Sequence, residues 1–159
     1  MIPPISGKVV GGEQMVAKIT SLRAAIREEL EATVSKLGDD VLARVKAKLS
    51  GPVLKAPTGN LRGSINKLME NTGDSIKASI GTSTAVIPYA RIHEYGGVIT
   101  PKNGPYLRFK TPDGKWHQVK SVTIPERSYL RSSLAEVEPI VATQIKAACR
   151  RAIQRVGLA

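Results

Sequence analysis

Residues 13–49 read EQMVAKITSLRAAIREELEATVSKLGDDVLARVKAKL, and this stretch sets the architecture of the chain. Its apolar side chains recur every three or four positions, which is the spacing of one face of an α-helix. They are Val16, Ile19, Leu22, Ile26, Leu30, Val34, Leu37, Val41, Val45 and Leu49. Gly38 lowers helix stability by about 1 kcal/mol relative to alanine and is a candidate bend. We therefore predict one long amphipathic helix that ends at Ser50-Gly51-Pro52.

The residues that follow this helix predict short elements separated by turns. Residues 56–65 form a turn in this interpretation, because proline fixes its own backbone angle and glycine admits positive φ. Residues 75–80 alternate between apolar and polar side chains, which predicts a half-buried strand. Farther on, Pro88 is placed to begin a single helical turn, and Gly96-Gly97 to end it.

A hairpin rich in positive charge is predicted next. Strand candidates occupy residues 98–100, 106–110 and 116–124, and Asp113-Gly114 is a favourable turn between the last two. Residues 102–120 contain five basic side chains against one acid. The basic residues are Lys102, Arg108, Lys110, Lys115 and Lys120. We call them the basic arm and expect it to protrude from the body.

The C-terminal segment is predicted to be helical again. Pro139 is placed to open this last helix, because proline is tolerated in a first turn and breaks a helix interior. One apolar arc of the helical wheel is expected to pack inward. It consists of Val141, Ile145, Ala148, Ala152 and Val156.

Length and composition limit the classes of protein. A chain of 159 residues fits one domain, residues 1–159, with residues 1–12 expected to be flexible. The single cysteine, Cys149, rules out an internal disulfide. Neither a signal-peptide pattern nor about 18 consecutive apolar residues occurs, so we expect no secretion and no membrane insertion.

Residue types that carry chemistry are present without the spacing that chemistry requires. His93-Glu94 would need a second histidine at position 97 to form a zinc-protease motif, and Gly97 stands there. The chain has neither a nucleophile elbow nor a phosphate-binding glycine loop. We expect no catalytic residue, no metal and no cofactor, and we interpret His93 as a hydrogen-bonded structural residue.

The formal charge of +11 raises the question of nucleic acid. Clustered lysine and arginine neutralise phosphates and release counterions. Residues 61–159 carry 15 basic and 7 acidic side chains, a net charge of +8, whereas residues 1–60 carry 9 and 6, a net charge of +3, so the excess positive charge lies in the second part of the chain. Sequence-specific DNA reading is not indicated, because neither a helix-turn-helix signature nor zinc-finger spacing is present. A solvated basic face, or one that meets an acidic neighbouring subunit, explains the charge equally well.

Three ordered blocks resemble one known family, the tail-completion or head-tail joining proteins of long-tailed bacteriophages, including the minor tail protein Z type. The blocks are Pro57-Thr58-Gly59-Asn60-Leu61-Arg62 with Ser64-Ile65; Tyr89-Ala90 with His93-Glu94-Tyr95-Gly96-Gly97; and residues 124–134, IPERSYLRSSL. The third block departs from the family pattern at Glu126, Ser128, Tyr129 and Ser132, where the family has a small residue, proline, phenylalanine and proline. The resemblance extends from about residue 49 to the end of the chain.

This resemblance implies an α+β fold, in which the long N-terminal helix and the C-terminal helix pack on a small, mostly antiparallel sheet. It implies a structural virion protein made in the host cytoplasm and assembled in the phage neck, and no catalysis. There a homo-oligomeric ring of six or twelve copies would complete the tail end and join it to the head around the DNA channel. Its partners would be the head-closure, tail-terminator or tail-tube proteins, with non-specific contact to genomic DNA. A non-specific nucleic-acid-binding domain, or an assembly factor outside the virion, is the alternative.

Candidates for the subunit interface come from the second and third blocks. They are Tyr89, His93, Glu94, Tyr95, Arg127, Tyr129 and Arg131. An alternative with equal support places Tyr89 and Tyr129 in the core and lets Arg127 hold a turn.

Overall fold

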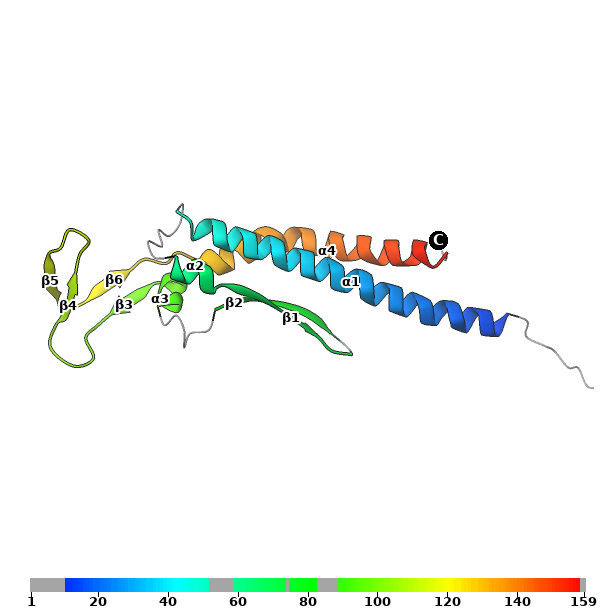
Figure 1. Cartoon of the computed structure of the whole chain (residues 1–159), viewed down its shortest axis with the longest axis horizontal. Coiled ribbons are helices and arrows are strands. Elements are labelled where there is room, and N and C mark those ends of the chain that lie inside the picture. The colour runs from blue at the N-terminus through cyan, green and yellow to red at the C-terminus, as the bar shows by residue number, and fades with distance from the viewer. Residues whose placement is uncertain (1–10, 52–58, 74, 83–88, 158–159) are drawn as a thin grey trace, which may run out of the picture.

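Two long helices run side by side along an elongated molecule (Figure 1). The computed structural model describes residues 11–51, 59–73, 75–82 and 89–157. Helix α1 spans Gly12–Lys48 and helix α4 spans Tyr129–Arg155. The predicted first helix is therefore confirmed to within a residue at each end. Of the N-terminal segment expected to be flexible, residues 1–10 lie outside the described residues.

Ion pairs along the outer edge join α1 to α4. Near the end of α4, Arg151 Nε lies 2.7 Å from a carboxylate oxygen of Glu29. At the other end of the pair, Glu136 accepts hydrogen bonds from Arg44 at 2.8 Å and from Lys48 at 2.7 Å. Exposed pairs of this kind contribute about 0.2–1 kcal/mol each, so burial between the helices carries more of the stability.

A β-hairpin packs beneath α1, and its first strand was missed in the sequence. Strand β1 (Asn66–Asn71) pairs antiparallel with β2 (Ile76–Gly81), which confirms the strand predicted at residues 75–80. The sequence of β1, NKLMEN, alternates too weakly to predict a strand. Gly38 explains how the hairpin fits, since a Cβ there would lie 2.9 Å from Lys67 Cδ and 3.0 Å from Ala78 Cβ. The glycine thus permits close packing of helix on hairpin.

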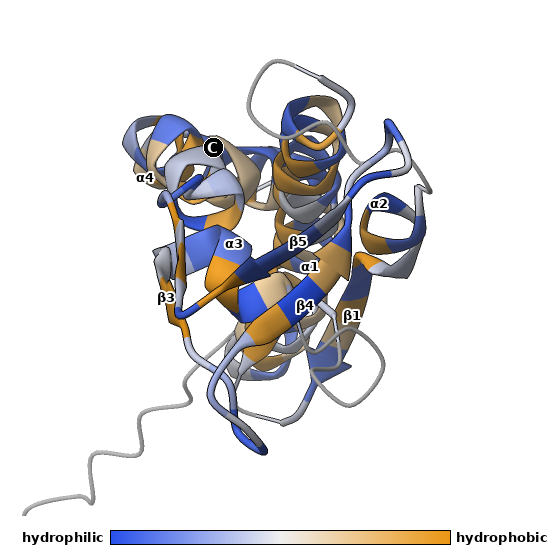
Figure 2. Cartoon of the chain, turned by 90° about the vertical axis from the view of Figure 1, so that its left-hand side faces the viewer, coloured by the Kyte–Doolittle hydropathy of each residue, from blue (hydrophilic) through white to orange (hydrophobic). Residues whose placement is uncertain are grey.

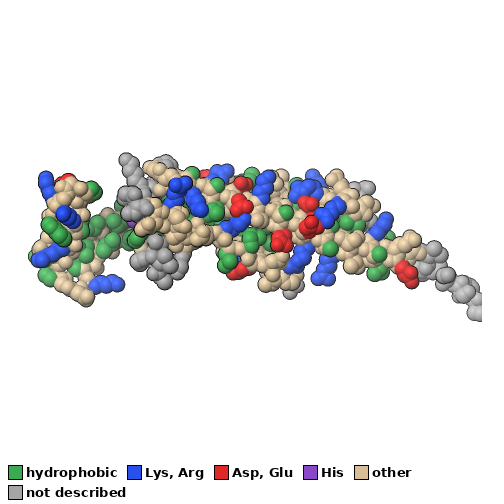
Figure 3. Space-filling view, in the orientation of Figure 1, with side chains coloured by type: hydrophobic (Ala, Val, Ile, Leu, Met, Phe, Trp, Pro, Cys, Tyr) green, Lys and Arg blue, Asp and Glu red, His purple; other side chains and the backbone are tan. Residues whose placement is uncertain are grey.

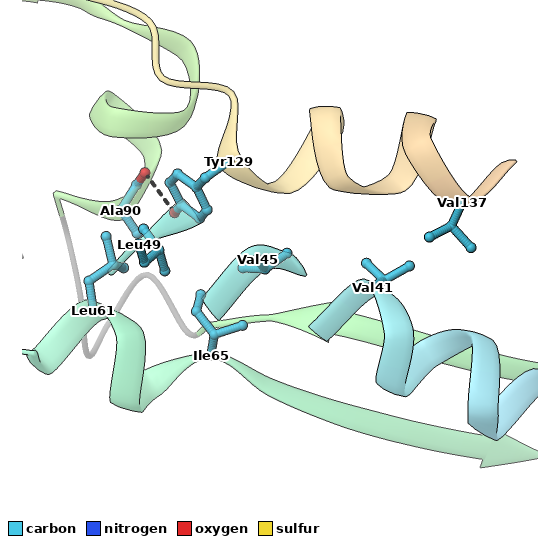
Figure 4. Close-up of a cluster of buried hydrophobic side chains, with 8 residues drawn as sticks. All are labelled: Val41, Val45, Leu49, Leu61, Ile65, Ala90, Tyr129 and Val137. Carbon is cyan, nitrogen blue, oxygen red and sulfur yellow. Dashed lines mark hydrogen bonds between the residues drawn. The ribbon is translucent and has the colours of Figure 1, made fainter. Parts of the chain in front are cut away.

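The apolar core lies where the C-terminal half of α1 meets two short helices and the start of α4 (Figure 4). The short helices are α2 (Asn60–Ser64) and α3 (Ala90–Tyr95). The buried cluster consists of Val41, Val45, Leu49, Leu61, Ile65, Ala90, Tyr129 and Val137. Residues 60–64, which we predicted as part of a turn, form a helical turn that buries Leu61. The remainder of that predicted turn, residues 56–58, lies outside the described residues, as does Pro88.

Two small antiparallel ribbons extend from this core to the far end of the molecule, which Figure 2 views end-on. Strand β3 (Gly97–Ile99) pairs with β6 (Val122–Ile124), and β4 (Leu107–Lys110) pairs with β5 (Trp116–Val119). The single strand predicted at residues 116–124 was wrong, because the chain breaks at residues 120–121 and changes partner. The α+β class with antiparallel strands is confirmed.

The predicted start of the last helix was also wrong. Helix α4 begins ten residues earlier, at Tyr129, and Pro139 lies inside it on the exposed side. Of the arc expected to pack inward, Ala148 and Ala152 are buried. Val141 is exposed, because the first half of α4 turns Ser133 and Val137 toward the core instead. The helix starts early because the Glu94 carboxylate accepts hydrogen bonds from its first turn.

Candidate assembly interface

The second and third sequence blocks meet at one buried carboxylate. Helix α3 ends at Gly96, whose φ of 68° and ψ of −178° lie in a region that glycine alone adopts without strain. A Cβ on Gly96 would lie 2.8 Å from the backbone nitrogen of Glu126. The glycine therefore lets the chain before β3 lie directly against the chain that follows β6. This close approach places Glu94 beneath the first turn of α4.

Glu94 caps helix α4 from a distance in sequence. Its side chain is 4% exposed, and its two oxygens accept hydrogen bonds from the backbone N–H groups of Leu130 and Arg131, both at 2.9 Å. The positive end of the helix dipole favours an anion at this place. Ser128, the residue before the helix, makes no capping bond with its own side chain, and within the described residues the cap comes from Glu94.

Arg131 closes the arrangement on its solvent side. Its Nε donates to Glu94 at 3.2 Å, and its Nη2 donates to Glu126 at 2.6 Å. The guanidinium carbon lies 4.5 Å from the centre of the Tyr95 ring, which is the geometry of a cation–π contact. The Arg131 side chain remains 49% exposed. We call Glu94, Tyr95, Glu126, Tyr129 and Arg131 the Glu94 junction.

Tyr129 anchors the junction to the core. It is 1% exposed, and its hydroxyl donates to the backbone oxygen of Ala90 at 3.2 Å, as Figure 4 shows. Burial, and after it the negative charge of Glu94, raise the pKa of Tyr129 to about 12. The backbone adds two bonds between the same segments, from Arg127 N to His93 O at 3.0 Å and from Ser128 N to Glu94 O at 3.1 Å.

His93 and Tyr89 lie beside the junction. Their rings meet edge to face, with centroids 5.9 Å apart. Burial, followed by the positive charge of Arg127, lowers the pKa of His93. No group of three His, Cys, Asp or Glu side chains that could hold a metal ion occurs in residues 11–51, 59–73, 75–82 and 89–157.

The seven interface candidates thus gather in one region, at different depths. Glu94 and Tyr129 are buried, and His93 and Arg127 are half-buried. The exposed edge consists of Tyr89, Tyr95 and Arg131. Sequence reasoning missed Glu126, which binds Arg131 and stands where the family pattern has a small residue. Its opposite charge five positions before Arg131 was the available signal.

The basic arm is spread over β4, β5 and the adjoining turns. Arg108 and Lys110 lie on β4, Lys115 follows the turn, and Arg108 Nε donates to Gln118 at 3.1 Å. Lys102 lies in the loop before β4, and Lys120 lies between β5 and β6. Aromatic side chains that stand among these charges are exposed, which the sequence did not indicate: Trp116 is 73% exposed and Phe109 39%. Phe109 stacks on His117 with ring centroids 5.8 Å apart.

The described helices include none with the length and apolar content of a membrane span.

Two of the three sequence blocks thus close on one hydrogen-bonded junction in an α+β body, and comparison with family models places the chain among the tail components of tailed bacteriophages. Within that class, the chain belongs to the HK97-gp10-like family. The family model described as "Bacteriophage HK97-gp10, putative tail-component" matches residues 13–96, which run from α1 to the end of α3. No curated protein and no solved structure matches the chain.

Proposed function

We propose that this protein forms a ring in the neck of a long-tailed phage, where it completes the upper end of the tail and joins it to the head around the DNA channel. Membership of a tail-component family carries the proposal. The three-block resemblance to tail-completion proteins narrows it to the neck. In this proposal residues 1–159 act as one domain with a structural role and no catalysis.

Exposed apolar side chains support an assembled state. Trp116, Val98 and Leu134 are 73%, 59% and 58% exposed. Large apolar side chains left in water on an elongated subunit are typical of surfaces that a partner covers. We expect Tyr89, Tyr95 and Arg131 to touch a neighbouring subunit or neck protein, and Glu94, Tyr129, His93 and Arg127 to hold them in position.

The basic arm is proposed to meet either an acidic neighbouring protein or the DNA in the channel. Both contacts would weaken as salt concentration rises, because both depend on charges near solvent. Replacing Lys102, Arg108, Lys110 and Lys115 by glutamine should lower virion yield and the salt tolerance of particles. If yield and salt tolerance are unchanged, the basic arm makes no such contact and its charges serve only solubility.

Cryo-electron microscopy of the virion neck tests the whole proposal. We expect a closed ring of this chain between the portal side and the tail tube. Absence of such a ring from intact particles would contradict the proposal and leave an assembly factor or a nucleic-acid-binding protein. DNA retention by the free chain at physiological salt separates these two, since an assembly factor need not retain DNA.

A further inference from the structure

The β4–β5 hairpin is a two-faced ribbon. Because side chains alternate along a strand, Arg108, Lys110, Trp116 and Gln118 share one face, and Leu107, Phe109, His117 and Val119 share the other. Lys110 and Trp116 are direct partners across the two strands, so a cation and a large aromatic ring stand side by side. We call this pair the Trp116–Lys110 face.

This face is uncovered. Trp116 is the most exposed of the large hydrophobic residues that the structure describes, whereas Leu107 and Val119 on the opposite face are half-buried. Figure 3 shows hydrophobic and basic side chains together at this end of the molecule, beyond the helical body. Strands β4 and β5 pack mainly on each other. An isolated two-stranded hairpin is marginally stable in water, so a partner surface would stabilise this one.

Helix α4 carries a surface of matching chemistry. Leu134, Glu138 and Val141 are spaced i, i+4 and i+7, which places them on one side of the helix. All three are exposed, Leu134 by 58% and Val141 by 36%. We call these three residues the α4 stripe. It combines two apolar side chains with one carboxylate.

The charge around the α4 stripe is opposite to that of the arm. Residues 132–145 contain two acids and no lysine or arginine, in a chain with 24 basic residues. The other acid, Glu136, is already bound to Arg44 and Lys48. Among the described residues Glu138 has no ion-pair partner, so its carboxylate is available to a cation from outside. An apolar stripe with a single anion suits an aromatic ring beside a single cation.

We propose that the hairpin of one copy docks on helix α4 of the next copy, with Trp116 packed on Leu134 and Val141 and with Lys110 paired to Glu138. The inference rests on the proposed ring and supplies its subunit contact. Donor and acceptor surfaces are different patches of the same chain, and such head-to-tail contacts generate a ring when the rotation closes. The exposed aromatic residue and the partner apolar pair would form the centre of the contact.

A disulfide cross-link tests the contact directly. The variant Gln118→Cys, Ala142→Cys places the thiols beside the contact and keeps Trp116, Leu134 and Val141. It also carries Cys149→Ser to remove the native thiol, and it is produced during infection by a phage that depends on this chain. Oxidised particles run without reductant should give a ladder of multimers that collapses on reduction. Variants with only Gln118→Cys or only Ala142→Cys in the Cys149→Ser background should give no ladder. A double-cysteine variant that enters particles and stays monomeric after oxidation overturns the inference.

Charge reversal provides an independent test of register. Lys110→Glu alone and Glu138→Lys alone should each reduce ring formation and phage yield at least tenfold, and the double reversal should restore both. Lys18→Glu and Asp40→Lys, exposed controls on α1 with the same charge changes, should leave ring formation intact. If the arm instead binds DNA, Lys110→Glu reduces yield and Glu138→Lys does not rescue it, which rejects the proposed contact.

The two proposals fail in different ways. If the chain is found in a neck ring and neither the cross-link nor the rescue is observed, the ring function stands and this contact is wrong. If the chain is absent from particles, the proposed function is wrong. In that case the same double-cysteine variant, purified as the full chain and oxidised at high concentration, decides the contact: a multimer ladder supports it and monomers reject it.

Discussion

The Glu94 junction and the β4–β5 hairpin use similar residue types in opposite ways. In the junction the Glu94 carboxylate is bonded to the Arg131 guanidinium and to backbone N–H groups, the Tyr129 hydroxyl is bonded to a backbone oxygen, and Glu94 and Tyr129 are almost entirely buried. In the hairpin a tryptophan and several cations lie in water, and Trp116 packs on little of its own chain. Polar groups that are satisfied inside the subunit stabilise the fold, whereas uncovered apolar groups add nothing to it until a partner arrives. The comparison separates residues that hold this chain together from residues that are available for assembly.

Removing the Glu94 carboxylate should produce the largest loss of stability. Glu94→Ala leaves the N–H groups of Leu130 and Arg131 without their acceptor at a buried helix start. We expect the free energy of unfolding to fall by about 3 kcal/mol, measured by urea titration followed by circular dichroism. Glu126→Gln, at an exposed partner of Arg131, is the matched control and should cost under about 1 kcal/mol. Equal losses in the two variants would contradict the assignment of Glu94 as the cap.

Gly96→Ala should have the next largest effect. The φ of 68° with an extended ψ strains any residue with a Cβ, and that Cβ would press on the backbone of Glu126. We expect a loss of about 2 kcal/mol in the same titration. Gly63→Ala, where a Cβ meets nothing within 4 Å, should not lower stability. If both glycines tolerate alanine equally, the close approach at Gly96 is not what positions the junction.

Tyr129→Phe should cost about 1 kcal/mol, because it removes one buried hydrogen bond and leaves the Ala90 oxygen unsatisfied. The hydroxyl also predicts a pH effect. The folded pKa of about 12 lies above the unfolded value of 10.0, so this stability is fully present below pH 10 and is lost as pH rises through 12. Between pH 10 and pH 12, the free energy of unfolding should fall more steeply with pH for the wild type than for Tyr129→Phe. Parallel curves would mean that Tyr129 does not titrate in this window.

Trp116→Ser should have the smallest effect on folding, with a change of about 0.5 kcal/mol or less in the free energy of unfolding. The same variant should assemble poorly, which native mass spectrometry of particles or of the purified chain can measure. A loss of stability as large as that from Tyr129→Phe would show that the hairpin belongs to the core of the subunit. The distinction between the two regions would then be wrong.

The helices were predictable from the sequence, and the junction was predictable only as a set of residues. Residues 13–49 repeat their apolar positions often enough for helical spacing to dominate. The start of α4 was not accessible in this way, because the group that caps it, Glu94, stands 35 positions before Tyr129. Pro139 wrongly suggested a helix start, because a proline inside a helix removes one backbone hydrogen bond. In α4 the cap by Glu94 offsets that loss.

Two further differences have physical causes that a single sequence conceals. Strand β1 carries Leu68 in an exposed position and pairs through its backbone, so its side chains alternate poorly. Ser128 stands where the family pattern has proline, and its φ of +45° is one that a proline ring excludes. The departures at Ser128 and Glu126 therefore occur together in one rebuilt turn. The resemblance to the family located the turn at residues 126–128 and did not predict its backbone conformation.

The β3–β6 ribbon has a consequence for how such chains can diversify. Gly97 lies opposite Ile124 and Ile99 opposite Val122, so the chain leaves the body and returns to it at neighbouring points. The entropic cost of closing a loop between fixed ends rises only slowly with the length of the loop. We therefore expect everything between residues 99 and 122 to be an exchangeable cassette, which can be shortened, lengthened or replaced while the helical body keeps its fold. One body can in this way be fitted to different neighbours by changing the cassette alone.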